Sequence, residues 1–291
     1  MSNGAVRRVL AESPWPVKIL GKLLLSRLPV PYRSWSTLAL FKHGAMEDPA
    51  YALDVVRGHV EAAAPPEGFV ALELGPGDTA ASALVAYALG ARATHLVDAG
   101  PYARRDLAPY LRVAAFLRRL GLRTPELERA RSLEDVLERC GATYSTEGIR
   151  SLRELPDASI DVSWSHAVLE HVRRDELPGT LRELRRLARP GGASSHEIDL
   201  EDHLAHALNS LRFPARMWES RLFASSGFYT NRLRASDLVR IFGQTGWEIQ
   251  ALRESRWAKL PTPRSRLAPE FRCLLDADLR VKQMRVLLRP H

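Results

Sequence analysis

The chain has 291 residues, 45% of them hydrophobic, and a formal net charge of +8 at pH 7. Such a chain can bury one large core with additions, which excludes a disordered protein or a small disulfide-stapled domain. Its two cysteines, Cys140 and Cys273, have no partner at metal-ligand spacing, so we expect neither a disulfide framework nor a zinc site. The basic residues are scattered rather than clustered, so the charge is weak evidence for a nucleic-acid partner.

Residues 1–47 are punctuated by prolines and contain a short apolar run at 19–25. The run is far too short to span a bilayer, and no cleavage site of a secretory signal follows it. We therefore expect a cytoplasmic protein with an N-terminal helical extension over 1–47 and one larger domain over 48–291. Four aromatic residues could anchor the extension to the core or, less readily, to a membrane surface: Trp15, Tyr32, Trp35 and Phe41.

Helical and strand periodicities alternate along the rest of the chain. The apolar pattern predicts helices over 48–63, 80–89, 104–120, 133–139, 175–188 and 235–245. It predicts strands over 70–74, 93–97, 142–145, 160–165, 193–198, 247–252 and 280–288. This alternation favours an α/β fold with a doubly wound, mostly parallel sheet. Residues 200–234 interrupt it with polar helices and aromatic side chains, and we expect them to form a helical lid inserted after the fifth strand.

The first strand ends in a turn with two glycines, and the second strand ends in an acid. Gly75, Gly77 and Ala80 fit the fingerprint G-x-G-x-x-A of dinucleotide sites, and Asp98 lies where a ribose-binding acid is expected. The spacing alone leaves the nucleoside cofactor open. A plainer alternative is that the glycines only end the strand and that Asp78 caps the next helix.

Charge favours one cofactor over another, because Glu73 and Asp78 lie on either side of the glycines. Two carboxylates would repel the pyrophosphate of a dinucleotide. S-adenosylmethionine has no phosphate, and it brings an ammonium and a sulfonium to the same turn. We therefore favour S-adenosylmethionine as the cofactor.

Further segments carry a resemblance to a known family. They read L-V-D-A-G at 96–100, L-P-D-A-S-I-D-V-S-W-S-H-A-V-L-E-H-V at 155–172 and L-R-E-L-R-R-L-A-R-P-G-G at 181–192. Together with V-A-L-E-L-G-P-G-D at 70–78, they resemble the class I S-adenosylmethionine-dependent methyltransferases over about residues 50–290. The resemblance implies a Rossmann-like, seven-stranded sheet whose last strand inserts antiparallel.

The same resemblance implies cofactor contacts for individual residues. Gly75 and Gly77 would pack under the cofactor, Glu73 would face its methionine end, and Asp98 would bind the ribose hydroxyls. Two further pairs would lie near the adenine and the methionine end respectively: Glu147 and Gly148, and Ser165 and His166. The family commonly has an Asp a few residues before L-P, which this chain lacks, so the adenine contact is the weakest of these.

Methyl transfer to an alcohol needs a general base, because a neutral hydroxyl is a poor nucleophile. The densest set of candidates follows the fifth strand, where doubly wound sheets place their ligands, and comprises His196, Asp199 and His203. If a helix begins at Asp199, this residue and His203 are four apart and share a face. The alternative is that Asp199 only caps that helix and that His203 and His206 are surface residues.

Glu170 and His171 follow the fourth strand. His171 could act as a base, but a Glu-His pair at a helix start often bonds to backbone and holds a loop, and we favour that structural role. Carboxylates of the segment 195–203, after the fifth strand, could also hold magnesium, although the spacing there does not demand it and we predict no metal.

Aromatic and polar side chains at 228–234 could complete an acceptor pocket. The tail is similar to that of bacterial methyltransferases acting on glycans or specialised metabolites. We expect O-methylation of a saccharide or another small polar metabolite. RNA methylation, a nicotinamide-dependent enzyme and a non-catalytic cofactor-binding module are the alternatives.

Overall fold

The computed structural model describes residues 15–17, 19, 45–226 and 228–291. The expected N-terminal helical extension over 1–47, with Tyr32, Trp35 and Phe41, lies almost wholly outside the described residues. Of its described part, Trp15 packs edge-on against Phe213, with ring centroids 6.0 Å apart.

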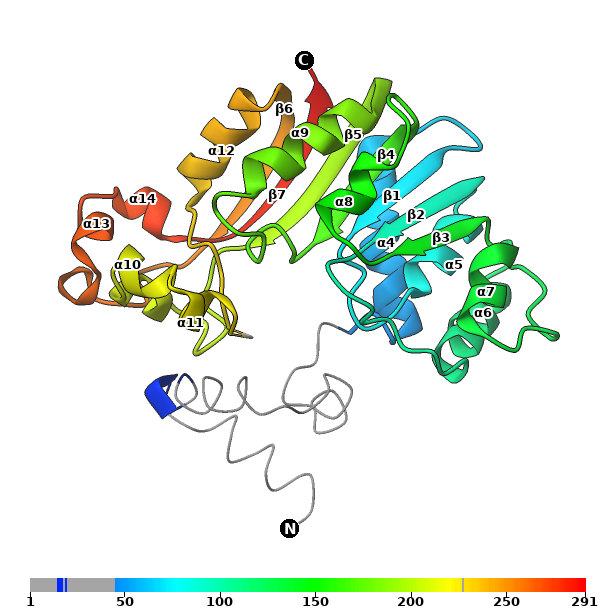
Figure 1. Cartoon of the computed structure of the whole chain (residues 1–291), viewed down its shortest axis with the longest axis horizontal. Coiled ribbons are helices and arrows are strands. Elements are labelled where there is room, and N and C mark those ends of the chain that lie inside the picture. The colour runs from blue at the N-terminus through cyan, green and yellow to red at the C-terminus, as the bar shows by residue number, and fades with distance from the viewer. Residues whose placement is uncertain (1–14, 18, 20–44, 227) are drawn as a thin grey trace, which may run out of the picture.

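A seven-stranded sheet forms the centre of the molecule, in the order β3-β2-β1-β4-β5-β7-β6 (Figure 1). The strands are β1 (Val70–Leu74), β2 (Ala93–Val97), β3 (Ala142–Ser145), β4 (Ile160–His166), β5 (Ala188–Asp199), β6 (Trp247–Arg256) and β7 (Val281–Pro290). The first five strands pair with one another in parallel, and β7 runs antiparallel to both β5 and β6. The expected doubly wound sheet with an antiparallel last strand is therefore confirmed.

Helices cover both faces of the sheet (Figure 1). One face packs against α4 (Pro49–Ala63), α5 (Ala81–Ala88), α6 (Ala108–Arg119) and α7 (Leu133–Arg139). The other packs against α8 (Ile149–Arg153), α9 (Leu177–Leu187) and α12 (Ala235–Gln244). All five residues of β1 are buried, because a strand covered on both faces has no solvent side.

The start and end of α4 follow from local chemistry. The Asp48 carboxylate accepts the backbone N–H groups of Ala50 and Tyr51, both at 3.0 Å, and Pro49 occupies the first turn, where its missing N–H costs nothing. Ala64 adopts a left-handed conformation and ends the helix. This helix carries Tyr51 toward the end of β4.

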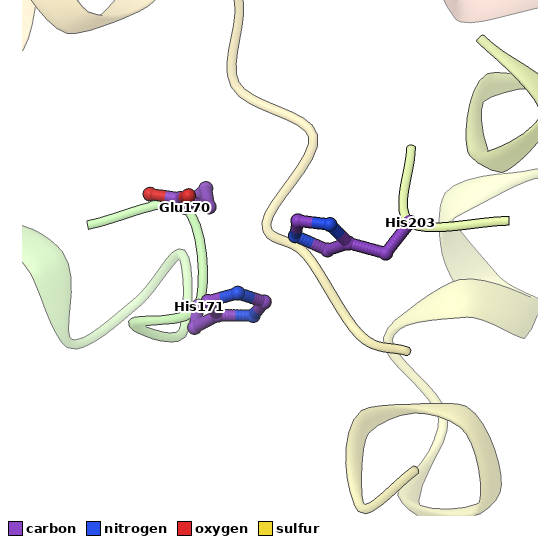
Figure 2. A group of neighbouring side chains, drawn as sticks. All are labelled: Glu170, His171 and His203. Atoms are coloured by element: carbon purple, nitrogen blue, oxygen red, sulfur yellow. The ribbon is translucent and has the colours of Figure 1, made fainter. Parts of the chain in front are cut away.

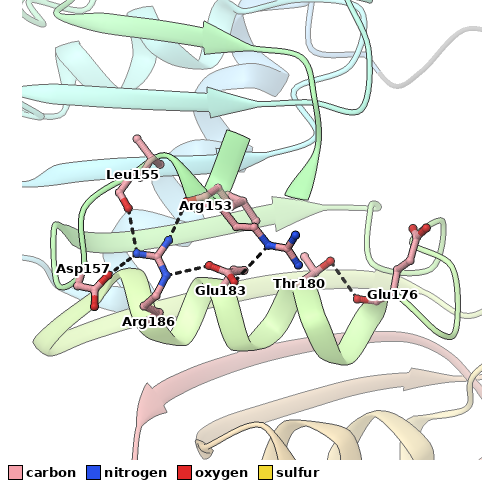
Figure 3. A network of polar contacts seen from close by, with 8 residues as sticks. Arg153, Leu155, Asp157, Glu176, Thr180, Glu183 and Arg186 are labelled. Carbon is pink, nitrogen blue, oxygen red and sulfur yellow. Dashed lines mark hydrogen bonds and ion pairs between the residues drawn. The ribbon is translucent and has the colours of Figure 1, made fainter. Parts of the chain in front are cut away.

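Arg186 ties α9 to the segment that leads into β4 (Figure 3). Its guanidinium donates to the carbonyl oxygens of Leu152 and Leu155, each at 2.9 Å, and forms ion pairs with Asp157 and Glu183. The planar fork of arginine can satisfy several acceptors at once. These contacts fix the approach of the chain to the start of β4.

The segment Pro190–Gly192 was expected to end the helix and turn into a strand starting at Ala193. The structure differs, because β5 already begins at Ala188 and contains this segment as a bulge. Ile160 pairs with Ala188 and Val162 with Ala193, so the extra residues bulge out of the ladder. Gly191 has a φ of 79°, which favours glycine.

Short helices gather beside β5, β6 and β7 (Figure 1). Residues 200–234 contain η1 (Asn209–Arg212), α10 (Ala215–Trp218) and α11 (Arg221–Ala224). The β6–β7 connection adds η2 (Arg264–Arg266), α13 (Pro269–Arg272) and α14 (Asp276–Leu279), which the sequence pattern did not predict. Leucines of the first segment share a cluster with Leu267, Phe271 and Leu279 of the second. Within the described ranges, no helix combines the length and apolarity that a membrane crossing requires.

Candidate active site

The glycine turn joins β1 to α5 and lies directly beside the end of β2. Gly75 and Gly77 have φ values of 74° and 68°, in the left-handed region that side chains disfavour. The Gly75 N–H donates to the Val97 carbonyl at 2.8 Å, and the Gly77 N–H donates to the Asp98 carboxylate at 2.9 Å. The structure therefore brings together the two glycines and the acid that the sequence singled out.

Asp98 also joins the end of β2 to the segment after β3. Its carboxylate accepts the N–H of Ala99 at 2.7 Å, and its carbonyl accepts the N–H of Gly148 at 2.8 Å. Glu147 precedes this glycine and forms an exposed ion pair with Arg150 at 3.3 Å. Glu147 and Gly148 thus lie beside Asp98, where the resemblance implies the nucleoside part of the cofactor.

Glu73 is buried and faces the interior. The Trp164 indole N–H donates to its carboxylate at 3.1 Å, and the Ser82 hydroxyl donates to the other oxygen. Burial raises the pKa of Glu73 to about 7; the bonds from Ser82 and Trp164 oppose this shift and the charge of Asp98 adds to it. We expected this carboxylate to face the methionine end of the cofactor, but its observed contacts instead tie β1 to α5 and β4.

Ser165 and His166 lie on opposite faces of β4, because successive strand residues alternate. The Ser165 hydroxyl is fully buried and lies 2.8 Å from Nδ1 of His196. His166 is half-buried on the α4 side, with the Tyr51 hydroxyl 3.0 Å from its Nε2. Burial lowers the pKa of His166, while Glu197, 3.7 Å away, acts in the opposite direction. Of the two side chains, only His166 keeps any exposure.

His196 is fully buried, contrary to the expectation of a base at the strand exit. Its Nε2 lies 2.7 Å from the Ser194 hydroxyl, and its Nδ1 lies 2.8 Å from the Ser165 hydroxyl. Burial lowers the pKa of His196 to about 3. The strand continues to Asp199, so His196 faces the core beneath its end. An imidazole whose two nitrogens are both engaged there does not suit a general base, and we do not propose it for that role.

Asp199 ends β5, but no helix begins there. The prediction that Asp199 and His203 share one face of a helix is therefore wrong. The chain turns instead, because the buried Asp202 carboxylate accepts the N–H groups of Leu204 at 3.0 Å and Ala205 at 2.7 Å. Asp199 is half-buried, and its carboxylate accepts the N–H of Glu201 at 3.0 Å. Burial is the main cause that raises the pKa of Asp199 to about 6.

His203 joins Glu170 and His171 in one cluster (Figure 2). One potential ligand atom from each residue lies within 4.8 Å of the others. Figure 2 shows the two imidazoles pointing toward one another from separate segments of the chain. Their rings stack with centroids 5.0 Å apart and planes 17° apart. The sequence favoured a structural role for Glu170 and His171 and did not join them to His203.

Glu170 is the buried member of the cluster, with 2% of its surface exposed. One carboxylate oxygen accepts the Asp199 N–H at 3.3 Å, whereas the other has no hydrogen-bond partner among the described residues. Burial is the main cause that holds the pKa of Glu170 well above its usual range, and the charges of Asp199 and Glu197 add to it.

The segment 228–234 holds this cluster in place rather than lining an open pocket. Phe228 and Tyr229 are buried in a cluster of aromatic rings with Trp218. The Asn231 side-chain amide donates to the carbonyl oxygens of Leu169 at 2.7 Å and Val172 at 2.9 Å. Asn231 therefore fastens both ends of the loop that carries Glu170 and His171. Asparagine suits this task because its amide donates twice.

Val168, in the same loop, covers the glycine turn. A Cβ placed on Gly75 would lie 2.6 Å from a methyl group of Val168, closer than atoms can pack. The preceding residue, Ala167, has a φ of 55°, which is unusual for a residue with a side chain. The loop that bears the polar cluster therefore lies directly on the turn.

The fold and the site define a class of protein. Strand order 3-2-1-4-5-7-6 with an antiparallel β7, and a glycine turn bonded to an acid at the end of β2, make a Rossmann-like site for a nucleoside cofactor. Residues 97–195 match the model of a methyltransferase domain family. Over this part of the chain the protein is similar to methyltransferase domains, which supports S-adenosylmethionine as the cofactor of the site.

A comparison with curated proteins finds no match to this chain. Among solved structures, a methyltransferase from Methanosarcina mazei is 14% identical, with a TM-score of 0.49 and with 81% of this chain and 96% of that chain covered. A methyltransferase from Mesorhizobium loti is 17% identical, with a TM-score of 0.43 and coverage of 84% and 98%. An arsenic(III) methyltransferase from Chlamydomonas reinhardtii is 20% identical, with a TM-score of 0.44 and coverage of 83% and 72%.

Proposed function

We propose that this methyltransferase transfers the methyl group to a hydroxyl oxygen of a saccharide or another small polar metabolite. The observation that carries the proposal is the polar cluster at the ends of β4 and β5, on the loop that packs against the glycine turn. Methyl transfer requires the acceptor atom in line with the sulfonium. Hydrogen-bonding side chains beside the turn suit an acceptor that carries hydroxyl groups.

We propose the cofactor contacts in two groups. Gly75 and Gly77 would pack under the cofactor, and Asp98 would bind its ribose hydroxyls. Glu147 and Gly148 would lie near its adenine. The backbone of Ser165, together with His166, would border the methionine end. Glu73 would act indirectly, because its carboxylate is engaged by Trp164 and Ser82.

Asp199 is our first candidate for the general base, and His203 is the second. Asp199 lies at the carboxyl end of β5, and its backbone N–H contacts Glu170. A base must come within hydrogen-bond reach of the acceptor hydroxyl. His203 is exposed on the adjacent turn and suits the same task.

The proposed function is tested by supplying S-adenosylmethionine labelled in its methyl group to a library of polar metabolites. We expect the label in a methyl ether. With the acceptor so found, Asp199→Asn should lower kcat by about 100-fold or more, as expected for general-base catalysis. Its affinity for S-adenosylmethionine should change less than about 2-fold, since the variant keeps the turn.

Asp54→Asn provides the matched control, because Asp54 is an exposed acid on α4. It should keep full turnover. Label found only on nitrogen or sulfur acceptors would contradict O-methylation. Unchanged kcat in both Asp199→Asn and His203→Ala would contradict the assignment of the base.

A further inference from the structure

We propose that Glu170, His171 and His203 bind a divalent transition-metal ion. The three residues come from the loop after β4 and the turn after β5, two segments that the sheet order makes neighbours. Two imidazoles and one carboxylate are the donors that a first-row transition ion takes from proteins.

The candidate ligand atoms are already close to the spacing that a bound ion requires. One candidate ligand atom from each residue lies within 4.8 Å of the other two. Atoms bound at about 2.1 Å to one ion lie up to about 4 Å apart, so a shift of about 1 Å suffices. His203 is exposed, so its ring can rotate toward the other two residues without disturbing the core.

His171 already has the supporting contact that metal-binding histidines use. Its Nδ1 lies 2.9 Å from the Tyr229 carbonyl oxygen, which can only accept a hydrogen bond. Nδ1 therefore carries the proton, and the ring lone pair is on Nε2. A backbone carbonyl in this position commonly fixes the tautomer and orientation of a histidine that ligates through its other nitrogen.

Glu170 supplies an independent observation. It is 2% exposed, and one of its carboxylate oxygens has no hydrogen-bond partner among the described residues. A buried carboxylate oxygen without a partner is costly. A bound cation would satisfy this oxygen. Asn231 holds the loop that presents it, because its side-chain amide donates to the carbonyl oxygens of Leu169 and Val172 and its backbone N–H donates to that of Glu170.

The donor set also selects the ion. Magnesium and calcium prefer all-oxygen sites, whereas imidazole favours zinc, cobalt, nickel, iron and copper. Three protein ligands leave further positions for water or for an oxygen of the acceptor. That the acceptor hydroxyl occupies such a position rests on the proposed function; the binding of the ion does not.

The test uses the full chain, stripped with a chelator and titrated calorimetrically with Zn²⁺, Co²⁺ and Mg²⁺ in separate experiments. We expect one Zn²⁺ or Co²⁺ per chain, visible absorption bands from the bound Co²⁺, and Mg²⁺ binding at least about 100-fold weaker. His203→Ala and Glu170→Gln should each weaken Co²⁺ binding by about 100-fold and remove its bands.

His206→Asn is the matched control, because His206 is an exposed imidazole on the same turn but lies outside the cluster and pairs with Glu201. It should bind Co²⁺ as the unchanged chain does. Thermal melting followed by circular dichroism checks that each variant is folded, and His203→Ala removes only an exposed side chain. Equal Co²⁺ affinity in His203→Ala, equal losses in His206→Asn, or no binding of Zn²⁺ and Co²⁺ would overturn the site.

The two proposals fail in different ways. Stoichiometric Co²⁺ binding that depends on His203, in a protein that methylates no hydroxyl, would support the ion site and contradict the proposed acceptor. Full O-methylation by a stripped chain that binds neither Zn²⁺ nor Co²⁺ would do the reverse.

Discussion

The side-chain amide of Asn231 donates to the carbonyl oxygen of Leu169 at 2.7 Å, across 62 residues of sequence. This bond joins the segment after β5 to the loop after β4. The same amide donates to Val172, and the Asn231 N–H donates to the Glu170 carbonyl at 2.7 Å. One buried side chain thus holds the loop that carries the polar cluster against the rest of the molecule.

Replacing Asn231 by Ala should release this loop. The buried carbonyl oxygens of Leu169 and Val172 lose their donors, which costs about 1–3 kcal/mol of stability. Amide hydrogen exchange should rise at 169–172, and turnover should fall while the affinity for S-adenosylmethionine stays nearly constant. Asn231→Asp keeps the shape of the side chain but removes both N–H donors. It should therefore destabilise the loop at least as much as Asn231→Ala does. Unaltered exchange at 169–172 in both variants would contradict the fastening role.

Glu73→Gln should change the pH dependence of stability. The folded state raises the pKa of Glu73 from 4.5 to about 7, so between these values the unfolded chain loses its proton first and stability falls as pH rises. The full effect is on the order of 3 kcal/mol above pH 7. A glutamine keeps an acceptor for Trp164 and carries no charge. Chemical denaturation at pH 5 and pH 8 should show a smaller decrease in the variant than in the unchanged chain.

His196→Ala should affect folding rather than chemistry. The substitution leaves the buried Ser165 hydroxyl without its partner, removes one of the two partners of the Ser194 hydroxyl and creates a cavity, at a cost of about 2–4 kcal/mol. Below the ordinary value of 6.5, the unfolded chain protonates this histidine while the folded state, with its pKa of about 3, does not. The free energy of unfolding therefore falls as the pH drops from 6.5 toward 3. The variant, which lacks this histidine, should lack this part of the pH dependence. A large loss of kcat in a fully folded His196→Ala variant would instead indicate a catalytic role for His196.

Asp98→Asn should weaken cofactor binding. The amide replaces one of the two carboxylate oxygens that accept the N–H groups of Gly77 and Ala99 and removes the charge expected to bind the ribose. Calorimetry should detect a loss of about 10-fold or more in affinity for S-adenosylmethionine. Asp106→Asn, at an exposed acid before α6, is the control and should bind normally. Equal affinity in the two variants would remove Asp98 from the site.

The sequence predicted the sheet and the glycine turn well, because both depend on local pattern. Buried strands read as short apolar runs, and Gly75, Gly77 and Asp98 follow them at fixed distances. The bulge at 189–192 could not be predicted, since it depends on how β5 pairs with β4. The four-residue helices between β6 and β7 are too short to give a helical period.

The candidate site was predicted less completely, because its side chains depend on where each strand ends. His196 was expected near the exit of β5, but its side chain points into the core beside Ser165 of β4 and is fully buried, which the strand pattern alone does not reveal. His203 was expected on a helix, whereas the Asp202 carboxylate turns the chain first. The contact of His203 with His171 joins two loops that are far apart in the sequence. Neither loop has a sequence pattern that predicts this contact.

The packing of Val168 on Gly75 makes the loop after β4 and the glycine turn one mechanical unit. A displacement of the loop would move the side chain that covers the turn. Because Asn231 fastens the loop from the segment after β5, a substitution at this position would be felt at the turn through Val168.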